Sequence, residues 1–357
     1  MRVLIAAGGT GGHISPGIAL AEEMEGRKKE LGIDEIYFHV PERNRSYPDF
    51  SRFHWSILWH NLPQFSKNIP VYLVRFLAAL IQGILKLKAR NIDIVIAMGG
   101  YSSVPAILYA ILYRKKFFLC EQNVIPGKVN RYFQGKAGKI ALHLPVPEGM
   151  LDSTKTRITG NPLRKAVIAR AVSRPKTVKS KKTGILVMGG SQGARQINNM
   201  VLAAFSDKLI ADNFRLTIIT GANLYDEVKG KVKDKNITLV PYTDRIADYL
   251  ADNDLLVARS GAGVVAEAAV MAIPAVYIPY PFAADNHQKY NARYFGENGA
   301  CWLIEHNSEN PDELVAILKE IIADKKVLKD KSKAQLALAI KKSSRLTVDF
   351  FFGVDSK

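Results

Sequence analysis

The chain has little cysteine and relatively few acidic residues. Its two cysteines, Cys120 and Cys301, are too few for a disulfide framework or a four-thiolate zinc site, so a reducing compartment is expected. Aspartate and glutamate number 33 against 50 lysines and arginines, which leaves a net charge of +17. This excess predicts anionic partners, but it does not distinguish nucleic acid, phosphorylated small molecules and anionic lipid. A hydrophobic share of 48% excludes a mostly disordered chain.

Long uninterrupted apolar runs are also absent from the sequence. The longest run, 69–87, is broken by Arg75, Gln82 and Lys86, and it is a poor candidate for a membrane span of roughly 20 mostly apolar residues. The apolar run at 3–7 is too short for a signal peptide. We therefore expect a protein without a transmembrane span or a leader.

Short apolar runs alternate with helix-length amphipathic segments along the whole chain. Near-continuous apolar strands of this kind predict an α/β fold, in which parallel sheets are covered by helices on both faces. The expected strands are 3–7, 35–40, 92–98, 117–119, 185–188, 216–220, 238–240, 255–258 and 275–278. Examples of the expected helices are 15–30, 195–209, 264–271 and 286–295.

A coarse duplication indicates two similar halves. Residues 3–12 resemble residues 185–193, because each segment has an apolar strand, a glycine pair, a hydroxyl-bearing residue and then a helix. A basic segment without apolar periodicity, 173–183, lies between them and has the composition of a linker. The length of the chain also suits two domains.

The duplication predicts two doubly wound, Rossmann-like domains that face a cleft. The first is expected over 1–160 and the second over 161–340, with a C-terminal helix at about 341–357 that packs back on the first. In such sheets ligands bind at the carboxyl ends of the strands.

Glycine pairs follow several of the expected strands. Glycine lets backbone N–H groups approach a ligand closely, and a helix N-terminus adds positive partial charge, so such loops suit phosphate groups. No loop ends in the Lys–Ser/Thr pair of a P-loop, and residues 9–14 break the spacing of a dinucleotide fingerprint. For any single loop, a tight turn between strand and helix is the alternative interpretation. The loops are 8–12, 99–103, 189–193 and 260–263.

The glycine loops belong to a longer series of motifs in one order along the chain. The series consists of 8–17 (GGTGGHISPG), 99–101 (GGY), 121–123 (EQN), 160–164 (GNPLR), 189–195 (GGSQGAR), 259–262 (RSGA) with Glu267, and 285–288 (DNHQ) with Asn291 and Ala292. Together these motifs resemble the family of bacterial MurG-type glycosyltransferases over nearly the whole chain. The resemblance implies the glycosyltransferase B fold and no required metal or other cofactor. It also implies inverting transfer of N-acetylglucosamine from UDP-N-acetylglucosamine to the C4 hydroxyl of undecaprenyl-pyrophosphoryl-N-acetylmuramyl-pentapeptide.

The resemblance implies that the second domain binds the UDP-sugar donor. Backbone groups at Ser191 and the helix that opens near Gly263 are expected to stabilise the UDP diphosphate, with Arg164 as a charged partner. Glu267 is expected to bind the ribose hydroxyls, and Gln288 the hydroxyls of the transferred sugar.

The resemblance also implies that the first domain binds the lipid-linked acceptor. Thr10, with Gly11 and Gly12 in the same loop, and Asn123 are expected to face the sugar and the acceptor. His13 is the candidate general base for the attacking hydroxyl.

Two segments of the second domain have competing interpretations. Thr243 is expected to lie against uracil, with Ile246 as the competing residue. Residues 252–254 match the D-x-D pattern of metal-dependent transferases, but they directly precede a strand, where acidic residues commonly form a turn. We expect no metal site there.

A lipid-linked acceptor places the protein at the cytoplasmic face of the cell membrane, as a peripheral protein. The segment 69–87 is either a buried core helix or a helix that rests on anionic headgroups. Basic residues that suit the second interpretation are Lys67, Lys86, Lys88, Arg90, Arg114, Lys115 and Lys116.

The sequence has alternative functional interpretations, and it differs from the family pattern at some positions. Another UDP-sugar transferase of this fold, such as a diacylglycerol glucosyltransferase, is the alternative enzyme. A nucleic-acid-binding protein is disfavoured, because no recognisable module accompanies the charge. Cys120 stands where the family commonly has histidine, and the aromatic-rich segment 41–66 has no assignment.

Overall fold

The computed structural model divides the chain into two compact units. They comprise Met1–Arg164 with Lys342–Lys357, and Lys165–Lys341. The sequence places this division at 160 and the return of the chain to the first unit at about 341. The described residues are 1–9, 11–45, 50, 54–63, 68–174, 181–190, 192–232, 234–305 and 309–354.

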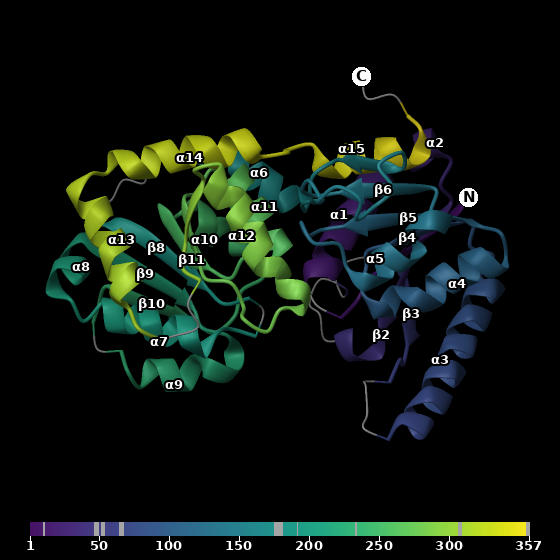
Figure 1. Cartoon of the computed structure of the whole chain (residues 1–357), viewed down its shortest axis with the longest axis horizontal. Coiled ribbons are helices and arrows are strands. Elements are labelled where there is room, and N and C mark those ends of the chain that lie inside the picture. Colours follow the sequence, from purple (N-terminus) through teal and green to yellow (C-terminus); the bar gives the residue numbers. More distant parts are fainter. Residues whose placement is uncertain are drawn as a thin grey trace. The chain divides into compact units, whose positions relative to one another are not determined.

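The first unit is built on a seven-stranded parallel sheet (Figure 1). Its strand order is β3-β2-β1-β4-β5-β6-β7, so the chain builds outward from β1 in one direction and then, from β4, in the other. Such a reversal is a topological switch point, beside which ligands bind at the carboxyl ends of the strands. The strands are β1 (Arg2–Ala6), β2 (Glu35–Pro41), β3 (Ser56–His60), β4 (Ile94–Ala97), β5 (Lys116–Glu121), β6 (Lys139–Leu142) and β7 (Thr156–Ile158).

Helices cover both faces of this sheet. Along β1, Val3 and Ile5 join a core cluster with residues of α1 and α15, whereas Leu4 and Ala6 join a second cluster with residues of α4. Because both faces are buried, every position of β1 after Arg2 is apolar. The helices are α1 (Gly11–Gly26), α2 (Lys28–Leu31), α3 (Ile69–Ala89), α4 (Val104–Leu112), α5 (Lys128–Phe133) and α15 (Ser343–Phe352), with 3-10 turns at Glu42–Asn44, Tyr101–Ser103 and Gln134–Lys136.

The C-terminal helix α15 packs against α1 and β6 of the first unit. The ring of Phe351 stacks on that of Phe118, with the centroids 4.8 Å apart. The buried Asp349 carboxylate pairs with the Arg27 guanidinium at 2.7 Å. Apolar packing and an ion pair therefore tie the end of the chain to its first helix.

Helix α3 is largely exposed, so the core-helix interpretation of 69–87 is wrong. Within α3, Gly83 and Leu87 are the buried residues, and Gly83 allows close approach to Pro105 of α4. By length and apolar composition, α3 could cross a membrane. Its large side chains that are 43–69% exposed are Ile69, Val71, Leu73, Val74, Leu77, Ile81 and Leu85.

The second unit repeats the strand order of the first. Its parallel sheet runs β10-β9-β8-β11-β12-β13, so β8 occupies the central place that β1 has in the first sheet, and the switch point lies between β8 and β11. The two similar sequence segments are therefore the central strands of the two sheets with the loops that follow them. The strands are β8 (Thr183–Met188), β9 (Phe214–Ile219), β10 (Ile237–Val240), β11 (Leu255–Ala258), β12 (Ala275–Tyr277) and β13 (Cys301–Leu303).

Helices also cover both faces of the second sheet. Ile197 of α7 and Leu318 of α13 pack with Ile185 and Val187 of β8 on one face, and α10, α11 and α12 lie on the other (Figure 1). The helices are α6 (Lys165–Ser173), α7 (Arg195–Ala204), α8 (Lys208–Asn213), α9 (Tyr225–Lys229), α10 (Ile246–Ala251), α11 (Ala262–Val270), α12 (His287–Glu297), α13 (Asp312–Ala323) and α14 (Lys326–Leu338), with 3-10 turns at Ala222–Leu224 and Ala284–Asn286.

The sequence patterns miss β3, β6, β7 and β13 and begin the first helix too late. These strands lie at or next to sheet edges, and the short runs that form them carry weaker apolar signals than the central strands do. Helix α1 begins at Gly11 rather than at residue 15. The sequence pattern misses this start because the first two residues of the helix are glycines, whose helix propensity is low. As at the start of any α-helix, the backbone N–H groups of this first turn have no acceptor within the helix.

One glycine of the loop after β8 is required by packing. Gly193 has φ of +75°, and a Cβ there would lie 2.0 Å from the carbonyl oxygen of Thr220. We predict that Gly193→Ala lowers the free energy of unfolding by on the order of 3 kcal/mol, through steric overlap and left-handed backbone strain. Thermal unfolding followed by circular dichroism measures the effect.

The matched control is Gly261→Ala. Gly261 has φ of −63° and no described atom within 4 Å of its Cβ position. This variant is expected to unfold at nearly the wild-type temperature, and equal stability of the two variants would contradict the packing argument.

Candidate active site

The carboxyl ends of β1 and β4 bring His13 against a glycine pair. His13 stands in the first turn of α1, and its Nδ1 lies 3.1 Å from the carbonyl oxygen of Gly8. Because a carbonyl oxygen only accepts hydrogen bonds, Nδ1 donates in this contact, which makes Nε2 the ring nitrogen that a neutral imidazole can use as a base. A Cβ at Gly99 would lie 3.5 Å from Nε2, and one at Gly100 would lie 3.2 Å from Cε1. This glycine pair therefore makes room for the imidazole. The sequence predicts a phosphate-binding loop at these glycines and does not predict this packing role.

The unassigned segment 41–66 reaches the same place. Oδ1 of Asn44 accepts the backbone N–H of Gly9 at 3.2 Å. The guanidinium of Arg43 lies 5.3 Å from the ring centroid of Tyr101, in the second glycine loop. No local pattern indicates Arg43 or Asn44, because both contacts depend on β2 lying beside β1 in the sheet.

Strand β5 ends in a buried carboxylate that holds Asn123. Oε1 of Glu121 accepts the backbone N–H of Asn123 at 2.9 Å and its side-chain amide at 3.4 Å. Oε2 accepts the N–H of Gly127 and the side-chain amide of Asn130, both at 2.8 Å. Burial raises the pKa of Glu121, while these N–H groups act in the opposite sense by stabilising the carboxylate. The sequence identifies Asn123 but not the carboxylate that positions it.

Buried amide groups lie beside Gly99. A Cβ there would lie 3.7 Å from Oε1 of Gln122 and 3.7 Å from Nδ2 of Asn130. Among the described residues, Nε2 of Gln122 and Oδ1 of Asn130 are buried without a hydrogen-bond partner. Nδ1 of His143 lies 2.9 Å from the Gln122 carbonyl oxygen, and burial lowers the pKa of His143 to about 4, so this imidazole is neutral at pH 7. Unpartnered buried amides are rare, and these can pair with substrate hydroxyl or amide groups.

In the second unit, the residue after β11 is a buried arginine. Arg259 donates through one guanidinium nitrogen to the carbonyl oxygens of Ile278 and Pro279, at 2.9 Å each. Its other terminal nitrogen donates to Oε1 of Gln196 at 2.9 Å. The guanidinium lies 5.5 Å from the ring centroid of Tyr280. Arg259 therefore joins the ends of β11 and β12 to α7 and fixes the segment that leads to α12.

The first residues of α12 are tied to the end of β11. The hydroxyl of Ser260 donates to the carbonyl oxygen of Gln288 at 2.8 Å, and Nδ2 of Asn291 donates to the Ser260 carbonyl oxygen at 3.2 Å. Oε1 of Gln288 accepts the N–H of Tyr280 at 2.9 Å. This contact orients the side-chain amide of Gln288 so that its nitrogen can donate to a sugar hydroxyl.

Open space lies at the carboxyl ends of β8 and β11. A Cβ at Gly190, Gly261 or Gly263 would have no described atom within 4 Å. Gly261 precedes α11, whose first N–H groups have no intrahelical partners, and the half-buried Glu267 stands further along the same helix. The N-terminus of α11 suits an anionic ligand, and the Glu267 carboxylate can accept hydrogen bonds from hydroxyl groups of the same ligand.

The predicted site residues divide between the two units. The first unit holds Gly11, Gly12, His13, Asn123 and Arg164, and the second holds Thr243, Glu267 and Gln288. Arg164 thus ends the first unit, although the sequence places it in the donor domain. The hydroxyl of Thr243 accepts the N–H of Arg245 at 3.0 Å, in the turn before Ile246 begins α10. Thr10 and Ser191 lie outside the described residues.

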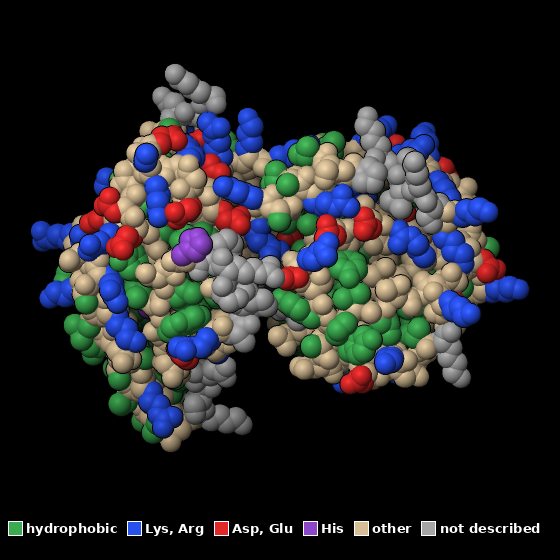
Figure 2. Space-filling model, turned by 180° about the vertical axis from the view of Figure 1, so that it is seen from behind, with side chains coloured by type: hydrophobic (Ala, Val, Ile, Leu, Met, Phe, Trp, Pro, Cys, Tyr) green, Lys and Arg blue, Asp and Glu red, His purple; other side chains and the backbone are tan. Residues whose placement is uncertain are grey.

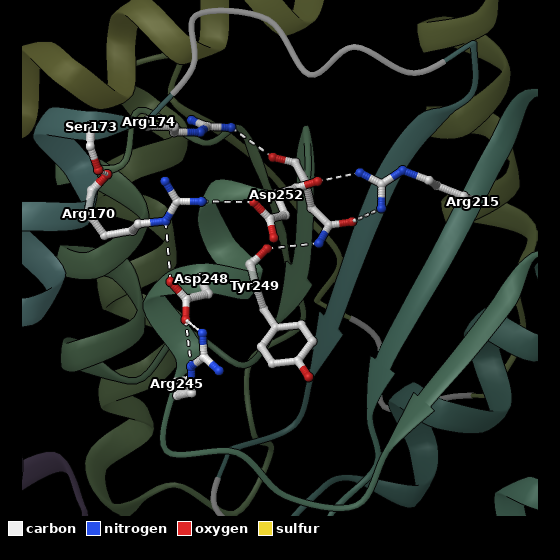
Figure 3. A network of polar contacts seen from close by, with 9 residues as sticks. Arg170, Ser173, Arg174, Arg215, Arg245, Asp248, Tyr249 and Asp252 are labelled. Atoms are coloured by element: carbon white, nitrogen blue, oxygen red, sulfur yellow. Dashed lines mark hydrogen bonds and ion pairs between the residues drawn. The ribbon is translucent and has the colours of Figure 1, made fainter.

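The acidic pair Asp252 and Asp254 makes structural contacts. Asp252 accepts a hydrogen bond from Arg170 at 2.9 Å, and Arg170 also pairs with Asp248 at 3.3 Å (Figure 3). The Asp254 carboxylate accepts the N–H of Gly184 at 2.8 Å. In the part of the chain that the structure describes, no group of three or more His, Cys, Asp or Glu residues could hold a metal ion. These contacts agree with the interpretation of the segment as a turn before β11.

Family models and solved structures establish what this architecture is similar to. The N-terminal domain of glycosyltransferase family 28 matches residues 3–142, and its C-terminal domain matches residues 184–347. The crystal structure of MurG from Acinetobacter baumannii has a TM-score of 0.74 at 22% identity and covers 98% of both chains. The predicted fold class, two Rossmann-like domains of the glycosyltransferase B type, is confirmed.

Curated relatives match over most of their length. A protein of Leptospira interrogans, named UDP-N-acetylglucosamine–N-acetylmuramyl-(pentapeptide) pyrophosphoryl-undecaprenol N-acetylglucosamine transferase, is 42% identical over 99% of both chains. A protein of the same name from Prochlorococcus marinus is 37% identical over 86% of this chain and 84% of its own. The chain therefore belongs to glycosyltransferase family 28, in the group that carries this transferase name.

Proposed function

We propose that the protein transfers N-acetylglucosamine from UDP-N-acetylglucosamine to N-acetylmuramyl-(pentapeptide) pyrophosphoryl-undecaprenol, the lipid-linked precursor of peptidoglycan. The observation that carries this proposal is the 42% identity, over 99% of both chains, to a relative of that name. Glycine loops beside the switch point of each sheet support it, because donor and acceptor both contain a diphosphate. The net charge of +17 has the matching sign.

In this proposal the second unit binds the donor. Glu267 accepts hydrogen bonds from the ribose hydroxyls, and Gln288 donates to the sugar. The open space at Gly190 and Gly263 receives the diphosphate, with Ser191 and Arg164 as further partners and no metal ion required. Thr243 lies near uracil.

The first unit binds the acceptor and supplies the base. Asn123 and the loop that contains Thr10, Gly11 and Gly12 hold the muramyl group and its diphosphate. Nε2 of His13 takes the proton of the C4 hydroxyl as that oxygen bonds to C1 of N-acetylglucosamine. The bond between C1 and the phosphate oxygen breaks, UDP leaves with the electron pair, and attack from the opposite face inverts the sugar carbon.

A transfer assay with a lipid-linked muramyl-pentapeptide acceptor tests this function. We expect the purified protein to transfer labelled N-acetylglucosamine to that acceptor and to release one UDP per transfer. Glu267→Ala should raise the KM for the donor by about tenfold, because it removes charged hydrogen bonds to ribose. Glu297→Ala, an exposed acid at the end of α12, is the control and should leave the KM unchanged.

One outcome of this assay would contradict the proposed function, and another would contradict one residue assignment within it. Transfer to diacylglycerol in place of the muramyl acceptor would identify the alternative glucosyltransferase function. Unaltered donor kinetics in Glu267→Ala would reject the ribose assignment alone.

The base role of His13 predicts a loss confined to turnover. His13→Ala is expected to lower kcat by about 100-fold or more, since it removes general-base catalysis, and to abolish the acidic limb of the pH–rate profile. The exposed His54 of the same unit offers a matched control, and His54→Ala should retain wild-type turnover. A His13→Ala enzyme with near-normal kcat and an unchanged pH profile would refute the assignment.

We also propose that α3 docks on the cytoplasmic leaflet as a peripheral surface. Hydrophobic side chains gather over α3 with Lys and Arg side chains among them, at the lower left of Figure 2. At the end of α4, Leu112 is 65% exposed and extends this apolar surface. Nζ of Lys88 lies 5.4 Å from the ring centroid of Tyr113, which joins the ends of α3 and α4. Exposed Lys88, Arg90 and Arg114 can approach anionic headgroups, each contributing on the order of 1 kcal/mol.

Vesicle sedimentation tests this surface. The protein should bind vesicles that contain phosphatidylglycerol and bind neutral phosphatidylcholine vesicles far less. Leu77→Asp should weaken binding by about tenfold or more, because it removes a buried leucine contact with the lipid. Val172→Asp, at an apolar residue of α6 that is 77% exposed, is the control. Equal binding to both kinds of vesicle would refute the electrostatic contribution.

A further inference from the structure

The loop between β5 and α5 is closed by one side chain. Both ends of this loop, at Asn123 and at Gly127, direct a backbone N–H to the carboxylate of Glu121. Glu121, the last residue of β5, is itself fixed before the loop begins, because its carbonyl oxygen accepts the N–H of His143 at 2.8 Å. Glu121 is 3% exposed, so water does not replace these contacts.

The donors around Glu121 require a carboxylate. Each of its two oxygens accepts from one backbone N–H and one side-chain amide, contributed by Asn123, Gly127 and Asn130. A glutamine has one carbonyl oxygen and one NH2 group, so in either orientation it would place a donor against a backbone N–H that cannot turn away. A buried N–H left without an acceptor is costly, so the loop would have to change its conformation.

The loop and the helix after it also carry polar groups that are suited to bind a ligand. Counting only atoms that the structure describes, Nε2 of Gln122, the first residue after the carboxylate, and Oδ1 of Asn130 are buried without a hydrogen-bond partner. Both side chains lie beside Gly99, whose Cβ position is 3.5 Å from Nε2 of His13. The carboxylate thus organises amides that lie next to the candidate base.

We propose that Glu121 is the positioning residue of the acceptor site. It holds Asn123, Gln122 and Asn130 in the geometry that binds the acceptor, and its own carboxylate does not contact the acceptor. This inference rests on the proposed function only in that the loop binds an acceptor. It assigns no proton transfer to Glu121. Its consequence is a loss of acceptor binding, and no loss of donor binding, when the carboxylate contacts are removed.

The first test replaces the carboxylate. Glu121→Gln is expected to raise the KM for the acceptor by about tenfold or more, since it removes charge-assisted hydrogen bonds that hold the loop, and to leave the KM for the donor unchanged. The control is Asp349→Asn, which removes another buried carboxylate of the first unit at its pairing with Arg27. Asp349→Asn should lower the melting temperature and leave both KM values unchanged.

The second test keeps Glu121 and removes one of its donors. Gly127 has φ of −64° and ψ of 151°, which proline adopts, and the nearest described atom to a Cβ there is Oε2 of Glu121 at 3.9 Å. Gly127→Pro removes this N–H, so it should raise the acceptor KM as Glu121→Gln does. Gly127→Ala keeps the N–H and should behave as wild type.

The outcomes separate this inference from the proposed function. If the wild type transfers to another lipid-linked acceptor, the proposed function fails, and the same variants are compared with that acceptor. A raised acceptor KM in Glu121→Gln and Gly127→Pro, with donor KM unchanged, supports the positioning role. An unchanged acceptor KM in Gly127→Pro, or a Glu121→Gln variant that loses stability alone as Asp349→Asn does, overturns it.

Discussion

Both units depend on one constraint, which is the burial of a central strand on both faces. Strands β1 and β8 carry apolar side chains in two directions, and helices cover each direction. Such strands have no position for polar chemistry, so functional side chains can stand only in the loops and helix ends beyond them. His13 and the open glycines Gly190 and Gly261 occupy those places, each beside the point where the strand order reverses.

Buried charged residues fix the loops at these ends, with opposite signs in the two units. Glu121 after β5 collects N–H groups, whereas Arg259 after β11 donates to carbonyl oxygens. Burying a charge is costly unless hydrogen bonds replace its hydration, and each residue has several such partners. Because these partners are backbone groups of the loops, the charge stabilises the loop conformation. Asn123 and Gln288 lie in the segments held in this way.

The candidate site residues that the sequence predicts are those that stand close together in the chain. The glycine loops, His13 and Asn123 stand within short motifs, and the structure places them at the ends of strands. Arg43 and Asn44 were missed because their contacts need β2 to lie beside β1. The edge strands β3, β7 and β13 were missed because partly exposed strands lack a continuous apolar run. The partners of Glu121 come from neighbouring residues and from α5, and only the folded loop brings them to one carboxylate.

The sequence by itself determined the α/β class, the duplication of the central strand and the series of motifs, because apolar periodicity and glycine spacing are local properties. The tertiary structure decided which glycines serve packing, as Gly193 and Gly100 do, and which leave open space, as Gly190 does. It also decided that α3 is exposed and that Asp252 pairs with Arg170. Burial and pairing depend on neighbours that are distant along the chain, and a pattern read along the chain does not contain those neighbours.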